Sequence, residues 1–162
     1  MQCSYKLLTD LIDRHPVISF DIFDTLLMRR TWYAEDVFDL VGYKAAREGI
    51  NIPSFRELRL KAQDALGLTN PNIYDIYDSF VNITGVTEAV RNRLIELEFE
   101  IEKEVLIPRN SMVDMLKYAL TMKKAVYLIS DMYLPTEFLT ELLKNLNGGV
   151  GEIIHVKLKE GL

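Results

Sequence analysis

Two aspartates follow a short apolar run near the start of the chain. The segment VISFDIFDTLL places Asp21 directly after β-branched and aromatic residues, and Asp24 comes three positions later. A carboxylate in such a place can attack a phosphoryl group and form an aspartyl phosphate. The reaction then needs positive charge, usually Mg²⁺ and a lysine, with hydroxyl donors and an acid for the leaving group. Asp21 is therefore a candidate nucleophile and metal ligand, and Asp24 a candidate acid.

Other parts of such a site follow two later apolar runs. Ser130 ends the run AVYLIS, and its hydroxyl is a candidate donor to phosphoryl oxygens. Lys157 and Lys159 follow the run EIIHV, and Lys159 is preferred over Lys157 as the source of positive charge. Asp131 has two interpretations: it contacts the substrate or a metal, or it caps the helix that begins near Pro135, and capping is preferred.

The elements that must position these residues alternate along the chain. Short apolar runs predict strands at 16–20, 125–130 and 152–156. Strands that alternate with helices imply a parallel α/β sheet, in which ligands bind at the carboxyl ends of the strands. We therefore expect Asp21 and Ser130 to meet in one crevice. Apolar residues at helical spacing predict helices at 4–14, 34–48, 54–66, 72–83, 86–106, 110–123 and 135–146.

The run RLIELEFEIEKEV (93–105) fits two structures. Its apolar residues alternate with glutamates as in a strand, but Leu94, Leu97 and Ile101 also share one helical face. Glutamate favours helices and is depleted in strands, so the helix is preferred. We expect the glutamates to form a solvated face rather than a metal cluster.

Two arginines follow the pair of aspartates. Arg29 and Arg30 lie where the chain leaves the first strand for the long helical stretch. An arginine that faced the site would suit an anionic substrate, but a solvated hinge is the preferred interpretation.

Composition narrows the class of protein. The chain has 162 residues, a formal net charge of −5 and 27% charged residues, which is typical of an ordinary globular protein and shows no basic stripe for nucleic acid. Cys3 is the single cysteine and cannot form an internal disulfide, so a reducing compartment is expected. No segment approaches the roughly 18 consecutive apolar residues of a membrane span. The acidic, amphipathic N-terminus does not resemble a signal peptide, and we expect a cytoplasmic protein.

Three of these segments together resemble the haloacid dehalogenase (HAD)-like superfamily. FDIFDTLL is similar to its first motif, a strand that ends in Asp-x-x-x-Thr-Leu, and VYLIS to its second, a strand that ends in Ser or Thr. KLKEGL stands where the lysine of the third motif is expected. ISFDIFDTLLMR with LISDMYLP resembles, more narrowly, a bacterial branch associated with or fused to glycosyltransferases.

The resemblance implies a Rossmann-like parallel sheet with an all-helical cap inserted after the first strand. The core would comprise residues 1–30 and 107–162, and the cap residues 31–106. It also implies that Thr25 and Asp131 bind substrate, and that Mg²⁺ is held by Asp21 and by the backbone carbonyl of Phe23.

Two departures from the family pattern bear on the reaction. The phosphatases of the family carry their acid two residues after the nucleophile, a position that Phe23 occupies here, while Asp24 stands where a glycine is usual. Asp24 can replace that acid only if the chain turns sharply after Phe23, because side chains three apart on an extended segment face opposite ways. Otherwise Asp24 stabilises the turn.

The second departure is the missing fourth motif, which supplies further acidic metal ligands. Mg²⁺ prefers octahedral oxygen coordination, and Asp21 with the Phe23 carbonyl would leave that site undersupplied. We expect either a chain truncated before this motif or a degenerate metal site, with truncation preferred.

The sequence thus predicts a Mg²⁺-dependent phosphatase that acts on a small phosphorylated metabolite, with a sugar or nucleotide-sugar phosphate suggested by the family context. The alternative is a non-catalytic domain that serves a glycosyltransferase as an interaction or regulatory partner. Dehalogenase chemistry is the least favoured hypothesis and depends on Phe23 alone, since the dehalogenases carry an aromatic residue there.

Overall fold

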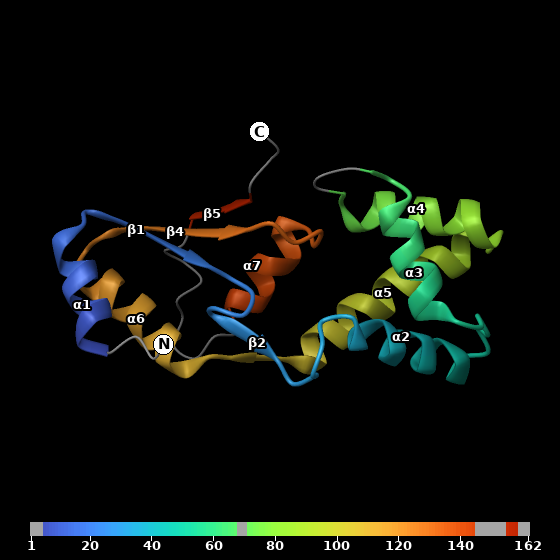
Figure 1. The fold of residues 1–162 in the computed structure, drawn as a ribbon, viewed down its shortest axis with the longest axis horizontal. Helices are drawn as coiled ribbons and strands as arrows, with labels where there is room; N and C mark the ends of the chain where they lie inside the picture. The colour runs from blue at the N-terminus through green and yellow to red at the C-terminus, as the bar shows by residue number, and fades with distance from the viewer. Residues whose placement is uncertain (1–4, 68–70, 145–154, 159–162) are drawn as a thin grey trace.

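The computed structural model describes residues 5–67, 71–144 and 155–158 of the chain. Figure 1 shows two lobes joined by a narrow connection. One, here called the sheet lobe, contains a small parallel sheet with three helices. The other, called the helical lobe, consists of the four helices that lie between the first and second halves of the sheet lobe in the sequence. The protein is therefore a mixed α/β structure.

The sheet contains β1 (Val17–Asp21), β4 (Ala125–Ser130) and β5 (His155–Leu158) in the order β1-β4-β5. Both neighbouring pairs are parallel, which confirms the expected parallel sheet. Asp21 pairs with Ile129, so β1 and β4 end at the same edge of the sheet. The third strand was expected at 152–156, but the structure carries it on to Leu158.

Three helices pack in the sheet lobe. Helix α6 (Asn110–Thr121) contacts both α1 (Tyr5–Arg14) and β4, while α7 (Thr136–Lys144) contacts β5. Apolar residues at helical spacing give each of these helices one face for the core, as the sequence predicted. The expected end of the last helix, 145–146, lies outside the described residues.

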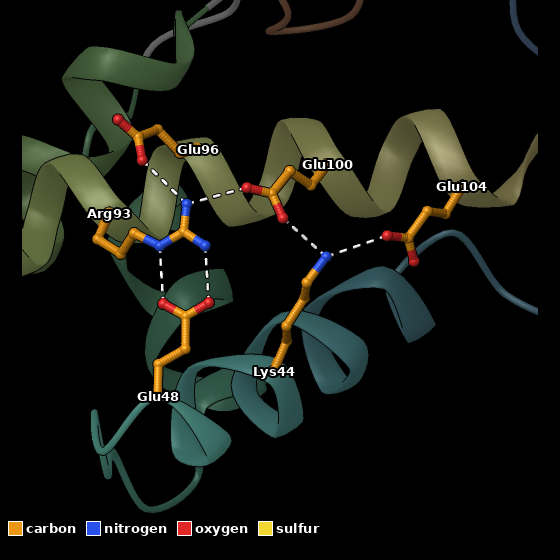
Figure 2. A network of polar contacts seen from close by, with 6 residues as sticks. All are labelled: Lys44, Glu48, Arg93, Glu96, Glu100 and Glu104. Carbon is orange, nitrogen blue, oxygen red and sulfur yellow. Dashed lines mark hydrogen bonds and ion pairs between the residues drawn. The ribbon is translucent and has the colours of Figure 1, made fainter.

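The helical lobe contains α2 (Asp36–Arg47), α3 (Phe55–Asp64), α4 (Ile73–Thr84) and α5 (Glu88–Val105). Helix α2 packs on α5, and α3 packs on α4. The segment 93–105 lies within α5, so the preference for helix over strand is confirmed. Charged side chains link the exposed surfaces of α2 and α5, as Figure 2 shows.

A two-stranded antiparallel sheet connects the lobes. Strand β2 (Leu27–Arg29) pairs with β3 (Leu106–Pro108), and Met28 lies opposite Ile107. The Arg30 amide donates to the Val105 carbonyl at 2.9 Å and extends the pairing. The sequence did not predict these strands, because three residues are too few to show a periodic pattern.

A continuous cluster of buried apolar side chains spans both lobes. No helix among the described residues is long and apolar enough to cross a bilayer.

Candidate functional site

Asp21 is the last residue of β1, and its carboxylate is exposed. The Thr25 hydroxyl donates to Asp21 Oδ2 at 3.1 Å. This bond holds one carboxylate oxygen and leaves the other available for a ligand. The structure therefore brings together two of the residues that the sequence singled out.

The chain turns sharply after β1. The Ile22 carbonyl accepts hydrogen bonds from the Leu26 and Leu27 amides at 2.9 and 2.8 Å. Asp24 lies within this turn at φ 55°, in the left-handed region that aspartate tolerates better than most residues. Arg109, the residue before α6, donates from Nη1 to the Asp24 carbonyl at 3.0 Å and holds the turn. The sharp turn that an acid role for Asp24 requires is thus present, and the Asp24 side chain is exposed.

Ser130 ends β4 beside Asp21 but is almost completely buried, with 2% of its surface exposed. Its hydroxyl accepts a hydrogen bond from the Met132 amide at 3.2 Å. Asp21 pairs with Ile129, so the next residue, Ser130, starts on the opposite face of the pleated sheet from Asp21. The strand ends are adjacent, but the two side chains have different partners, Thr25 for Asp21 and the Met132 amide for Ser130.

A pocket of about 330 Å³ opens beside Asp21 and Thr25. Most of its wall comes from apolar side chains of α1, β1 and α6, among them Leu11, Phe20 and Met115. Such walls offer few hydrogen bonds to a sugar. Polar recognition in this pocket would therefore depend on the groups near Asp21.

Phe23 lies beneath a buried arginine. The Arg29 guanidinium carbon is 4.8 Å from the centre of the Phe23 ring, and its nitrogens donate to Glu102 at 2.8 and 3.2 Å. The side chain of Arg29 is only 7% exposed, so the expectation of a solvated hinge is wrong for this residue. Burial alone would lower the pKa of Arg29, but the Glu102 carboxylate raises it overall. Burial raises the pKa of Glu102 despite the opposing effect of Arg29.

A second buried ion pair lies one helical turn away. Arg59 donates to both oxygens of Glu98 at 2.9 and 3.1 Å, and neither residue is exposed. The Tyr77 hydroxyl donates to Glu98 Oε2 at 2.7 Å. Burial alone would lower the pKa of Arg59, but the charge of Glu98 raises it overall. The expectation that all the glutamates of this helix are solvated is therefore wrong for Glu98 and Glu102.

One signal in the local sequence separates Glu98 from its exposed neighbours, because it lies four residues after Leu94 and three before Ile101, on the face that the apolar residues share. The spacing of four residues between Glu98 and Glu102 places both on one helical face, but their arginine partners come from α3 and β2. Helical spacing could therefore have indicated that Glu98 faces the core, but not which arginine neutralises it.

Asp131 is exposed and follows Ser130. Helix α7 begins at Thr136, so Asp131 does not occupy its N-cap and the capping interpretation is wrong. Lys157 lies inside β5 with its backbone paired to Ile129, so it does not follow the strand as expected. Lys159 lies outside the described residues, and its place beside Asp21 stays a prediction.

Within the described part of the chain, no three His, Cys, Asp or Glu side chains gather as a metal site. The Asp21 carboxylate and the Phe23 carbonyl could supply two oxygen ligands. Mg²⁺ commonly keeps several waters and binds through one or two carboxylates with substrate phosphate, so this donor set fits the ion only in part.

Neither a comparison with models of known protein families nor a search of curated proteins finds a match to this chain. The likeness to the HAD-like superfamily consequently depends on the motifs around Asp21 and Ser130.

Proposed function

We propose that the protein is a HAD-like phosphohydrolase that acts through an aspartyl phosphate on a small phosphorylated metabolite. The observation that carries the proposal is the exposed Asp21 carboxylate at the carboxyl end of a parallel strand. One of its oxygens is held by Thr25 at 3.1 Å, which orients the other for attack on a phosphorus atom. Phosphorus would gain a bond to Asp21, the leaving oxygen would take a proton, and water would then hydrolyse the aspartyl phosphate.

The turn after Phe23 supports Asp24 as the acid in this scheme. Its left-handed φ breaks the strict alternation of an extended strand, so spacing from Asp21 no longer excludes it from the same side. When bound, Mg²⁺ would be held by Asp21 and the Phe23 carbonyl and would supply positive charge to the phosphoryl oxygens. Ser130 and Lys159 are the proposed further contributors.

Asp21→Asn tests the nucleophile directly. Inorganic phosphate release is measured from a panel of sugar phosphates, nucleotide sugars and an apolar aryl phosphate, with Mg²⁺ or with a chelator. Removal of a nucleophile that acts with its partners as a unit is expected to cost at least about 10³-fold in turnover. Activity that persists in Asp21→Asn at wild-type level would reject the assignment.

Asp24→Asn is the matched substitution three residues away. If Asp24 is the acid, turnover falls roughly 10²- to 10⁴-fold while a substrate with a good leaving group, such as the aryl phosphate, loses far less. Equal rates for wild type and Asp24→Asn on all substrates would show that Asp24 only shapes the turn.

The second candidate function is a non-catalytic partner domain for a glycosyltransferase. It is favoured by Phe23, which is buried under Arg29 in the position where the family's phosphatases place their acid. Size-exclusion chromatography of the protein mixed with a purified bacterial glycosyltransferase tests this candidate. Co-elution together with no turnover on the substrate panel supports it, and turnover that requires Asp21 rejects it.

A further inference from the structure

Tyr133 belongs to the sheet lobe but makes its main contacts in the helical lobe. It lies in the loop between β4 and α7. The Arg59 guanidinium carbon is 4.9 Å from the centre of its ring, and the Ile73 amide donates to its carbonyl at 2.9 Å. One residue thus contacts both α3 and α4 from the opposite lobe.

The arginine that faces this ring is held rigidly. Glu98 binds Arg59 through both carboxylate oxygens, and the guanidinium also lies 4.6 Å from the Phe38 ring centre and 5.3 Å from that of Tyr77. With no exposed surface, Arg59 cannot follow Tyr133 if the lobes move apart. The attraction of the cation for the ring therefore acts between two lobes rather than between two flexible side chains.

The backbone contact gives the Ile73 amide a hydrogen-bond acceptor that α4 itself cannot supply. Ile73 is the first residue of α4, and the first amides of a helix have no partner within it. Its partner is the Tyr133 carbonyl, on the other lobe. Separation of the lobes would expose this amide to water.

Two further side-chain links between the lobes, besides those at β2 and β3, join α5 to α7. Phe99 stacks on Phe138 with ring centres 4.7 Å apart, and Lys103 pairs with Glu141 at 2.8 Å. These contacts reach α5 alone. Tyr133 differs from these residues because its ring contacts Arg59 on α3 and its carbonyl accepts from Ile73 on α4.

We propose that Tyr133 is a latch that holds the helical lobe against the sheet lobe, and that its release lets the lobes separate about β2 and β3. The loop that carries Tyr133 begins directly after Ser130, whose hydroxyl is bonded to the Met132 amide. Release of the latch would therefore also loosen the end of β4. Only this consequence for catalysis rests on the proposed function, because the latch itself is tested without any substrate.

The distance between the lobes is measured with spin labels on the full chain. In a Cys3→Ser background, Ala46→Cys on α2 and Thr121→Cys at the end of α6 carry the labels, since both positions are exposed. Tyr133→Ala is expected to shift the distance distribution by several ångströms and to broaden it. Tyr133→Phe keeps the ring over Arg59 but removes the hydroxyl that interacts with Glu98, and is expected to shift the distances less than Tyr133→Ala does. Tyr133→Leu keeps apolar volume without the aromatic face and is expected to release the latch even if the alanine variant folds poorly.

Hydrogen exchange at the Ile73 amide gives an independent readout. Tyr133→Ala leaves the accepting carbonyl in place, so faster exchange reports separation of the lobes rather than loss of the acceptor. Exchange at least about tenfold faster supports the latch. The control is Tyr118→Ala, which removes a half-buried tyrosine that bonds to Asp13 within the sheet lobe. Wild-type distances and exchange in Tyr133→Ala, or equal changes in Tyr118→Ala, would overturn the proposal.

Discussion

The glutamates of α5 are either buried or solvent-facing, according to the side of the helix from which each side chain projects. Glu98 and Glu102 lie on the buried face and each binds an arginine through both oxygens. Glu96, Glu100 and Glu104 lie on the outer face and bind Arg93 or Lys44. A buried ion pair contributes little net stability over apolar residues, but removal of one partner is costly because the other stays charged and unsolvated.

Arg59→Met is therefore expected to lower the free energy of unfolding by about 3–5 kcal/mol, since it leaves Glu98 buried without its counter-charge. Urea unfolding at pH 7 measures the change. Arg56→Met is the matched control, because Arg56 pairs with Asp39 at the surface and solvent screens that pair. A loss in Arg59→Met no larger than in Arg56→Met would contradict the role assigned to burial.

Asp24 has a structural role that can be separated from its proposed chemical one. Its left-handed backbone conformation closes the turn that follows β1, and its carbonyl is held by Arg109. In the proposed reaction, the same turn would decide whether the Asp24 side chain can reach the leaving group of a substrate at Asp21.

Among the helices, α4 has the most complete start signal. The Asn72 side chain accepts from the Asp75 amide at 3.0 Å, and the Asp75 side chain accepts from the Asn72 amide. This capping box satisfies two amides that the helix leaves without partners. Asn72 is thus the N-cap of α4, and the helix ends where Gly85 adopts a left-handed conformation.

Asn72→Ala is expected to cost about 1 kcal/mol of unfolding free energy, because it removes the cap acceptor. Chemical denaturation measures the loss. Asn82→Ala is the control, an exposed asparagine in the last turn of the same helix, where alanine is the better helix former. Destabilisation of both variants by the same amount would show that capping is not the cause.

For the whole molecule, the charge network between α2 and α5 makes stability depend on pH (Figure 2). Hydrogen bonds from Arg93 lower the pKa of Glu48, and those from Lys44 and Arg93 lower the pKa of Glu100. Their contribution is therefore complete above the ordinary glutamate pKa of 4.5 and is lost as pH falls through the lower folded pKa values. Glu102 acts in the opposite direction, because burial raises its pKa and folding favours its protonated form.

Arg93→Ala is accordingly expected to destabilise the protein most near pH 7, and its unfolding free energy should approach that of the wild type as pH falls below about 4.5. Denaturation curves from pH 7 to pH 3 measure this convergence. Arg47→Ala removes another exposed arginine, from the end of α2, and is expected to show no such trend. A difference between Arg93→Ala and wild type that stays constant with pH would contradict the account.

The sequence alone was sufficient for the elements whose signals are local. The β-branched run before Asp21 predicted β1, the run AVYLIS predicted β4, and their alternation with helices predicted the parallel sheet. It also placed Asp21 and Ser130 at the ends of those strands. Periodicity and capping are properties of neighbouring residues, so they can be read without knowledge of distant partners.

Only the tertiary structure decided which charges are buried and which strand-end side chains meet. Arg59 and Glu98 are 39 residues apart, and the local sequence does not show that they are partners. The turn at Asp24 and the short pairing of β2 with β3 likewise depend on contacts from Arg109 and the end of α5. A charged side chain is stable in a protein interior only beside an oppositely charged partner. The fold brings that partner from a distant part of the chain, so the local sequence does not show it.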